Sequence, residues 1–229
     1  MQLAPTDSYL WLEEILSQES LDWVKTQNDQ TEALFKSNPH YEKIKQALIG
    51  AATNQDKMPS IAYRNGWFYN FWQDDTNVKG IWRRVPVEHY TAKGIPWETL
   101  MDLDALSLAE GKDWIWGGSN GFYPTFERFM ISLSIGGSDA KVVREWDLET
   151  KSFVEDGFIV PEGKNTVNWI SFNEILVSAN FGPGSLTKSG YPYQTKRWVR
   201  GTKLEEAPVF FEGKDTDVSA RVSYCRDKG

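Results

Sequence analysis

Ser119 is the residue whose type and spacing come closest to hydrolytic chemistry. It lies in residues 117–121, GGSNG, which satisfy the G-x-S-x-G pattern of a serine nucleophile on a sharp strand-to-helix turn. That turn needs a helix after the last glycine, but residues 122–125 read FYPT, and proline does not fit a helix beyond its first turn. The sequence therefore predicts a glycine-rich turn between strands at this position rather than a nucleophile.

The other side chains that could act as acids, bases or ligands have the spacing of turns and surfaces. His40 and His89 have no second histidine or cysteine at ligand spacing, so no metal site is indicated. The pairs Asp74-Asp75 and Asp102/Asp104 have the residue type for acid–base catalysis, but aspartate in polar turns usually binds the neighbouring backbone. The sequence therefore predicts no catalytic, cofactor-binding or metal-binding residue, and no cofactor.

Two basic runs have two interpretations. Arg83-Arg84 and residues 196–200, KRWVR, have the charge to steer a peptide carboxylate, and they equally fit alternation on exposed strand faces. Residues 182–185, GPGS, lack the following lysine and helix of a phosphate-binding loop. None of these runs predicts a function by itself.

The composition is that of an ordinary acidic globular chain. Its 229 residues are 40% hydrophobic and 14% aromatic, and 25 basic against 32 acidic side chains give a formal charge of -7. A negative surface repels nucleic acid and anionic membrane, so neither is expected as a main partner. Cys225 is the only cysteine and cannot form an internal disulfide, which favours a cytoplasmic location. The sequence also shows no signal peptide and no run of about 18 apolar residues.

Eleven tryptophans are many for this length. Aromatic side chains favour pleated, half-buried surfaces, so the simpler interpretation is that the tryptophans pack sheets together. A surface that stacks on sugars or peptides is the alternative.

The elements that must position these residues change in kind along the chain. Residues 7–52 have helical periodicity, with Ser20 as the expected cap of the first helix and Asn38-Pro39 between two helices. From Ser60 onward the pattern is that of strands, beginning with a hairpin around Asn65-Gly66. Residues 104–107 are expected to lead into a polar loop, and residues 218–225 alternate like a strand.

The stretch 128–154 predicts three short antiparallel strands. Phe129, Ile131 and Leu133 alternate onto one face, residues 136–139, GGSD, suit a tight reversal, and two further strands follow at 141–147 and 152–154. Phe68, Met130 and Leu176 occupy similar places in three such groups. This uneven repeat favours a β-propeller or part of one, with a single sandwich of about ten strands as the alternative.

Several motifs, in order along nearly the whole chain, resemble the prolyl oligopeptidase family of serine peptidases. Residues 7–13, DSYLWLE, resemble the family's D-P-Y-x-W-L-E entry with Ser8 in place of proline. The further matches are residues 69–74, 82–84, 133–140, 147–151, 189–192 and 196–198. GGSNG even resembles the family's nucleophile motif, but both histidines precede Ser119, whereas the family order is Ser, Asp, His.

The resemblance implies a mainly β chain with an N-terminal α segment. Residues 1–57 would be the helical segment, and residues 58–229 would be about three blades of a seven-bladed β-propeller that covers an α/β-hydrolase domain. That domain, with its catalytic Ser, Asp and His, is expected to be absent from this chain. The chain would then be inactive alone and would gate the access of short peptides to its partner domain.

A second hypothesis is a stand-alone β-rich binding module for peptides or glycans, in which exposed aromatic rings would stack on the ligand. It differs from the first hypothesis in requiring tryptophan and tyrosine side chains on the surface.

Overall fold

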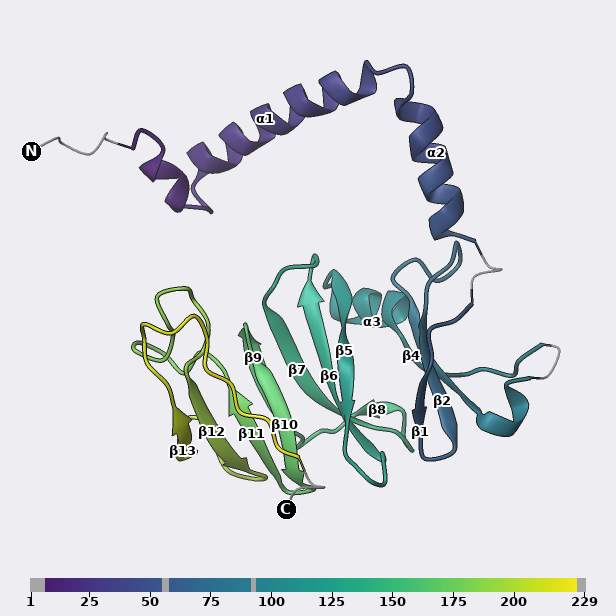
Figure 1. Cartoon of the computed structure of the whole chain (residues 1–229), viewed down its shortest axis with the longest axis vertical. Coiled ribbons are helices and arrows are strands. Elements are labelled where there is room, and N and C mark those ends of the chain that lie inside the picture. Colours follow the sequence, from purple (N-terminus) through teal and green to yellow (C-terminus); the bar gives the residue numbers. More distant parts are fainter. Residues whose placement is uncertain (1–6, 55–57, 92–93, 226–229) are drawn as a thin grey trace, which may run out of the picture. The chain divides into compact units, whose positions relative to one another are not determined.

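A computed structural model describes residues 7–54, 58–91 and 94–225 (Figure 1). The chain forms two compact units, residues 1–55 and residues 56–229, and each is described by itself. No helix in the described part of the chain is long and apolar enough to cross a membrane.

The first unit is helical. A 3-10 helix, η1 (Leu10–Glu13), precedes α1 (Gln18–Lys36) and α2 (Tyr41–Ala52). The prediction that Ser20 caps the first helix is wrong. The cap is Ser17, whose hydroxyl accepts the Ser20 amide at 3.1 Å, so α1 begins three residues earlier than expected. Within this unit the apolar stripes of both helices stay exposed, with Leu34 70% and Leu48 65% exposed.

The second unit begins with an antiparallel sheet of four strands in sequence order, here called the first sheet. Its strands are β1 (Ala62–Arg64), β2 (Trp67–Trp72), β3 (Ile81–Pro86) and β4 (Glu98–Asp102), with the short 3-10 helix η2 (Val87–His89) between β3 and β4. The Asn65-Gly66 hairpin is confirmed, and both residues have the positive φ that its tight turn needs.

A helix, α3 (Leu103–Glu110), joins the first sheet to the second. The prediction that residues 104–107 lead into a polar loop is therefore wrong. Asp102 caps the helix by accepting the Ala105 amide, and Leu103 and Ser107 are buried. Gly111, in the left-handed conformation, ends it. The polar appearance of this stretch came from the cap and the exposed face of a short amphipathic helix.

The second sheet contains the predicted three-stranded meander. Its strands are β5 (Trp114–Gly121), β6 (Arg128–Ile135), β7 (Lys141–Asp147) and β8 (Ser152–Phe153), and β9 (Ile159–Gly163) also pairs with β7. The meander β6–β7–β8 is confirmed, whereas β5 and β9 are strands that the sequence did not predict.

The third sheet comprises β10 (Thr166–Ser171), β11 (Glu174–Ser178), β12 (Gln194–Val199) and β13 (Val209–Glu212). Phe68, Met130 and Leu176 lie in β2, β6 and β11, the second strand of each sheet, as the repeat predicted. The strand expected at 218–225 is wrong. That segment forms no ladder and touches the third sheet through single bonds, such as the one from Asn168 Nδ2 to the Val222 carbonyl.

The three sheets pack face to face through two apolar clusters, and hydrogen bonds join the first strands of the second and third sheets. One cluster joins the first and second sheets through residues such as Trp82 and Phe129, and the other joins the second and third through Met130 and Trp169. Trp169 Nε1, in β10, donates to the Asn120 carbonyl in β5 at 3.0 Å.

Replacing Gly80 tests how closely the first sheet is packed. Gly80 has φ +101°, and a Cβ there would overlap the Phe71 ring, which stacks on Trp116 with centroids 5.1 Å apart. Gly80→Ala should lower the free energy of unfolding by about 2–4 kcal/mol, from left-handed strain plus overpacking.

Gly66→Ala is the matched control, because Gly66 also has a positive φ, +83°, but a Cβ there would meet nothing within 4 Å. Gly66→Ala should lower the free energy of unfolding only by the left-handed backbone strain, about 1–2 kcal/mol, measured by urea unfolding. Equal losses in the two variants would contradict the packing argument.

Candidate functional site

Ser119 lies inside strand β5 and pairs with Ile131 of β6, so the predicted turn at this position is wrong. The glycines of GGSNG have packing roles: Gly118, with φ +117°, follows a register shift in the β5–β6 ladder, and a Cβ on Gly121 would overlap the Phe126 ring. Glycine is uncommon in strands, which is why the sequence pattern resembled a turn. A mid-strand serine does not have the strand-to-helix geometry of a nucleophile elbow.

Ser119 and His89 both belong to the second unit, and no hydrogen bond joins their side chains in the described chain; His40 belongs to the first unit. His89 is exposed at the end of η2, and His40 is exposed in the helical unit. Asp74 accepts the Thr76 and Asn77 amides, and its pKa is lowered chiefly by the Asn77 backbone bond. Among the described residues, no group of three or more His, Cys, Asp or Glu side chains could hold a metal.

Asp102 and Asp104 likewise serve the backbone. Asp102 caps α3, and Asp104 accepts the Lys79 amide at 3.0 Å. Both carboxylates bind backbone amides, as expected, but they do so at a helix start and across to Lys79 rather than in a polar turn.

Most cations of the basic runs are packed against aromatic rings, whereas Arg197 lies on the exposed face of β12, as alternation along the strand predicts. The Arg83 guanidinium lies between Trp72 and Trp97, 4.5 and 4.4 Å from their ring centroids, and burial lowers the pKa of Arg83 to about 10. Buried Lys196 donates to the carbonyls of Leu204 and Glu205. These cations therefore hold sheets and loops in place.

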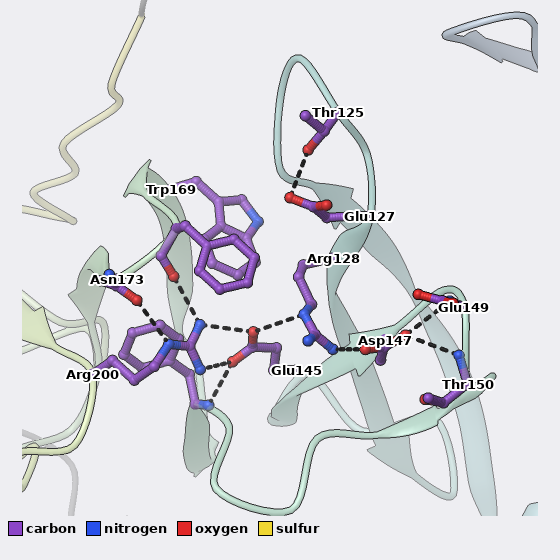
Figure 2. Close-up of polar contacts among 12 residues, drawn as sticks. Thr125, Glu127, Arg128, Glu145, Asp147, Glu149, Thr150, Trp169, Asn173 and Arg200 are labelled. Carbon is purple, nitrogen blue, oxygen red and sulfur yellow. Dashed lines mark hydrogen bonds and ion pairs between the residues drawn. The ribbon is translucent and has the colours of Figure 1, made fainter.

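The buried ionic contact between the second and third sheets is the most constrained polar arrangement in the described chain (Figure 2). The Glu145 side chain, on β7, is fully buried. Arg200, which follows β12, binds it with both terminal nitrogens, at 2.9 and 2.8 Å. The Phe158 amide donates to the same carboxylate at 2.9 Å, and Arg128 Nε lies 3.9 Å from it.

Each partner of Glu145 is fixed in turn. Arg200 donates to the Phe172 carbonyl and lies over the Phe158 ring, 4.6 Å from its centroid. Arg128 also pairs with Asp147, two residues along β7 from Glu145. Figure 2 shows the row Arg200, Glu145, Arg128 and Asp147 crossing from the third sheet to the second. The arrangement can hold the two sheets in one relative position. It offers no free nucleophile, acid or base for catalysis.

Sequence reasoning missed Glu145 and Arg200. The available signal was the position of Glu145 on the same strand face as buried Val143, but Lys141 and Asp147 share that face, so the pattern did not single out Glu145. Such a residue demands a buried cation as partner, but the strand pattern does not say which one.

Arg200→Met tests this contact. It leaves the Glu145 carboxylate buried without its bidentate partner, so the free energy of unfolding should fall by about 3–5 kcal/mol in urea unfolding. Arg197→Met is the matched control, because Arg197 also binds a glutamate, Glu174, but is 48% exposed. That variant should lose at most about 1 kcal/mol. Similar losses in both would contradict the assigned importance of burial.

The contribution of Asp147 to stability depends on pH. Burial raises the pKa of Asp147, but the Thr150 amide and the Arg128 guanidinium lower it by more, so its pKa lies below the ordinary value. A lowered folded-state pKa means that stability from Asp147 is present above the unfolded pKa of about 4 and is lost as pH falls through the folded value.

Asp147→Asn should therefore destabilise the chain at pH 7 and much less at pH 3. The measurement is urea unfolding of both proteins at the two pH values. A difference between them that stays constant with pH would show that the carboxylate charge of Asp147 does not contribute.

Comparisons with known proteins agree on one family. The family model described as prolyl oligopeptidase, N-terminal beta-propeller domain, matches residues 4–228. The uncharacterized peptidase y4nA of Sinorhizobium fredii is 42% identical over 224 residues, 97% of this chain and 31% of that protein. The uncharacterized peptidase RP174 of Rickettsia prowazekii is 35% identical over 210 residues, 88% of this chain and 29% of that protein.

The solved structures include a similar fold in a post-proline cleaving enzyme from Rickettsia typhi. The likeness has a TM-score of 0.84 at 34% identity and covers 91% of this chain and 31% of that one. The chain thus spans about a third of the length of the relatives it matches. Its three sheets are propeller blades, and the chain belongs to the prolyl oligopeptidase family as that family's N-terminal β-propeller domain.

Proposed function

We propose that this chain gates the access of short peptides to an α/β-hydrolase domain that lies outside the 229 residues, in a serine peptidase of the prolyl oligopeptidase type. By itself the chain is not catalytic. In this proposal residues 1–57 are a helical segment and residues 58–229 are the first blades of the propeller, in a cytoplasmic enzyme. The observation that carries it is the likeness to a post-proline cleaving enzyme over 91% of this chain.

The geometry of the candidate nucleophile supports the non-catalytic part of the proposal. Ser119 is paired within the β5–β6 ladder, and no hydrogen bond joins it to His89 in the described chain. A serine without a base to take its proton is a poor nucleophile. The chemistry of the family therefore needs residues from elsewhere in the protein.

The arrangement of sheets supports the gating part. Three blades packed in series form a wall segment: an apolar cluster joins the first to the second, and hydrogen bonds and the buried ionic contact join the second to the third. A wall held this way excludes ligands by size. The exposed apolar stripes of α1 and α2 offer a surface for the hydrolase domain.

The alternative of a stand-alone module that stacks ligands on tryptophan is disfavoured. Most of the tryptophan rings in the sheets are used in packing and are closed to a ligand. The buried ones are Trp72, Trp82, Trp114, Trp146, Trp169 and Trp198.

Hydrolysis assays test the proposal. The 229-residue chain should not turn over a chromogenic prolyl peptide, and Ser119→Ala should behave identically. A chimera in which this chain replaces the corresponding third of the y4nA peptidase should cleave a short prolyl peptide, and should cleave an unfolded protein with the same prolyl sites at least about tenfold more slowly, because a size filter restricts entry.

Two results would contradict the proposal. One is turnover by the chain alone that Ser119→Ala abolishes. The other is a folded, active chimera that cleaves the short peptide and the unfolded protein at equal rates.

A further inference from the structure

A cavity of about 610 Å³ lies between the second and third sheets, apart from the buried ionic contact. It is bordered by the first strands, at Gly117 of β5 and Thr166 of β10, and by the turns at 137–139 and 164–165. Residues 219–221 close another side. The volume is within the range of about 300–1,000 Å³ that small-ligand sites occupy.

The charge of this cavity is opposite to that of the chain. Lys141, Lys164 and Arg221 line it against a single carboxylate, Asp139, whereas the whole chain has a formal charge of -7. Within the described ranges none of the three cations forms an ion pair; Lys141 and Lys164 are half-buried and Arg221 is exposed. Most of the half-buried arginines, in contrast, do form ion pairs. Unpaired cations that converge on one cavity favour an anionic ligand.

Two of these cations have close neighbours at the cavity. A Cβ on Gly117 would lie 3.1 Å from Lys141 Cδ, so the missing side chain leaves room for the lysine stem across β5. Lys164 Nζ lies 4.3 Å from the centroid of the Tyr191 ring. Asn165 Nδ2, next to Lys164 in the sequence, donates to the Lys141 carbonyl at 2.6 Å and so ties the β9–β10 turn to β7.

One polar atom at the cavity lacks a partner. Thr166 Oγ1 is buried and makes no hydrogen bond within the described chain. A buried hydroxyl without a partner is unfavourable, and a ligand oxygen would supply the missing hydrogen bond. The neutral lining, chiefly the hydroxyl groups of Ser134, Ser138 and Ser219, suits the amide groups of a peptide better than it suits an apolar ligand.

We propose that this cavity binds the C-terminal carboxylate of a short peptide through Lys141, Lys164 and Arg221, with Thr166 donating to the same end. The inference rests on the proposed gating function, because a filter through which peptides pass meets their free carboxylates. It assigns a charge preference to a wall that would otherwise select by size alone.

Calorimetric titration of the 229-residue chain tests the inference directly. The probes are an acetylated tetrapeptide with a free C-terminal carboxylate, the same peptide with a C-terminal amide, and inorganic phosphate. The free acid should bind roughly tenfold more tightly than the amide, as the loss of charge-assisted hydrogen bonds predicts. Phosphate should bind more weakly than the free acid, because it makes no amide contacts.

Variants assign the binding to the cavity. Lys164→Gln, in a turn, and Lys141→Gln should each lower the affinity for the free-acid peptide by about fivefold to tenfold. The affinity for the amide peptide should stay nearly unchanged. Lys203→Gln is the control, since Lys203 is 77% exposed and does not line the cavity. Circular dichroism and urea unfolding confirm that each variant is folded.

Three results would overturn the inference: equal affinity for acid and amide, folded lysine variants that bind like the unchanged chain, or phosphate that binds at least as tightly as the acid. The titration measures no turnover, so a failure to bind the free acid would not contradict the gating proposal, which the hydrolysis assay of the chimera tests. Failure of the chimera in that assay would in turn leave measured carboxylate binding intact.

Discussion

A fully buried carboxylate, Glu145, is the constraint to which the second and third sheets are both fitted. An ionised carboxylate removed from water costs several kcal/mol unless its oxygens are matched by donors. Here the donors come from two sheets: the Phe158 amide from the second, and the Arg200 guanidinium from the end of β12 in the third. Both sheets must therefore hold one relative position for the cost to be met.

The apolar contacts around this carboxylate depend on a strand that is buried on both faces. In β6, Phe129, Ile131 and Leu133 point to the first sheet, whereas Met130 points to the third. Alternation along a strand sends successive side chains to opposite faces, so a single strand supplies both interfaces. A slip of one residue in β6 would exchange the two sets and misplace both clusters.

Local signals of the sequence predicted the elements whose partners lie nearby. The Asn65-Gly66 hairpin and the meander at 128–154 depend on turn chemistry and alternation, and both are present. The glycine-rich strand β5 was taken for a turn because its glycines serve close packing, a reason that appears only once β6 and Phe126 are in place.

The pairing of Glu145 with Arg200 spans 55 residues, and no local pattern encodes a contact of that length. The same holds for the cavity, whose cations come from β7, from the β9–β10 turn and from the segment after β13. The helix α3 was missed for another reason, since its short length leaves little periodicity and its Asp102 cap resembles a turn residue.

The ionic contact and the cavity are two uses of charge at one interface between sheets. Where the guanidinium of Arg200 meets the buried Glu145 carboxylate, both charges are paired within the protein, and the bidentate geometry joins the end of β12 to β7. Where Lys141 and Lys164 line the cavity, neither lysine forms an ion pair in the described chain. The pairing of Lys141 with Gly163 in the β7–β9 ladder, with the Asn165 bond to the Lys141 carbonyl, fixes the backbone that carries both lysines. A binding site that is already organised loses little free energy to ordering when a ligand enters.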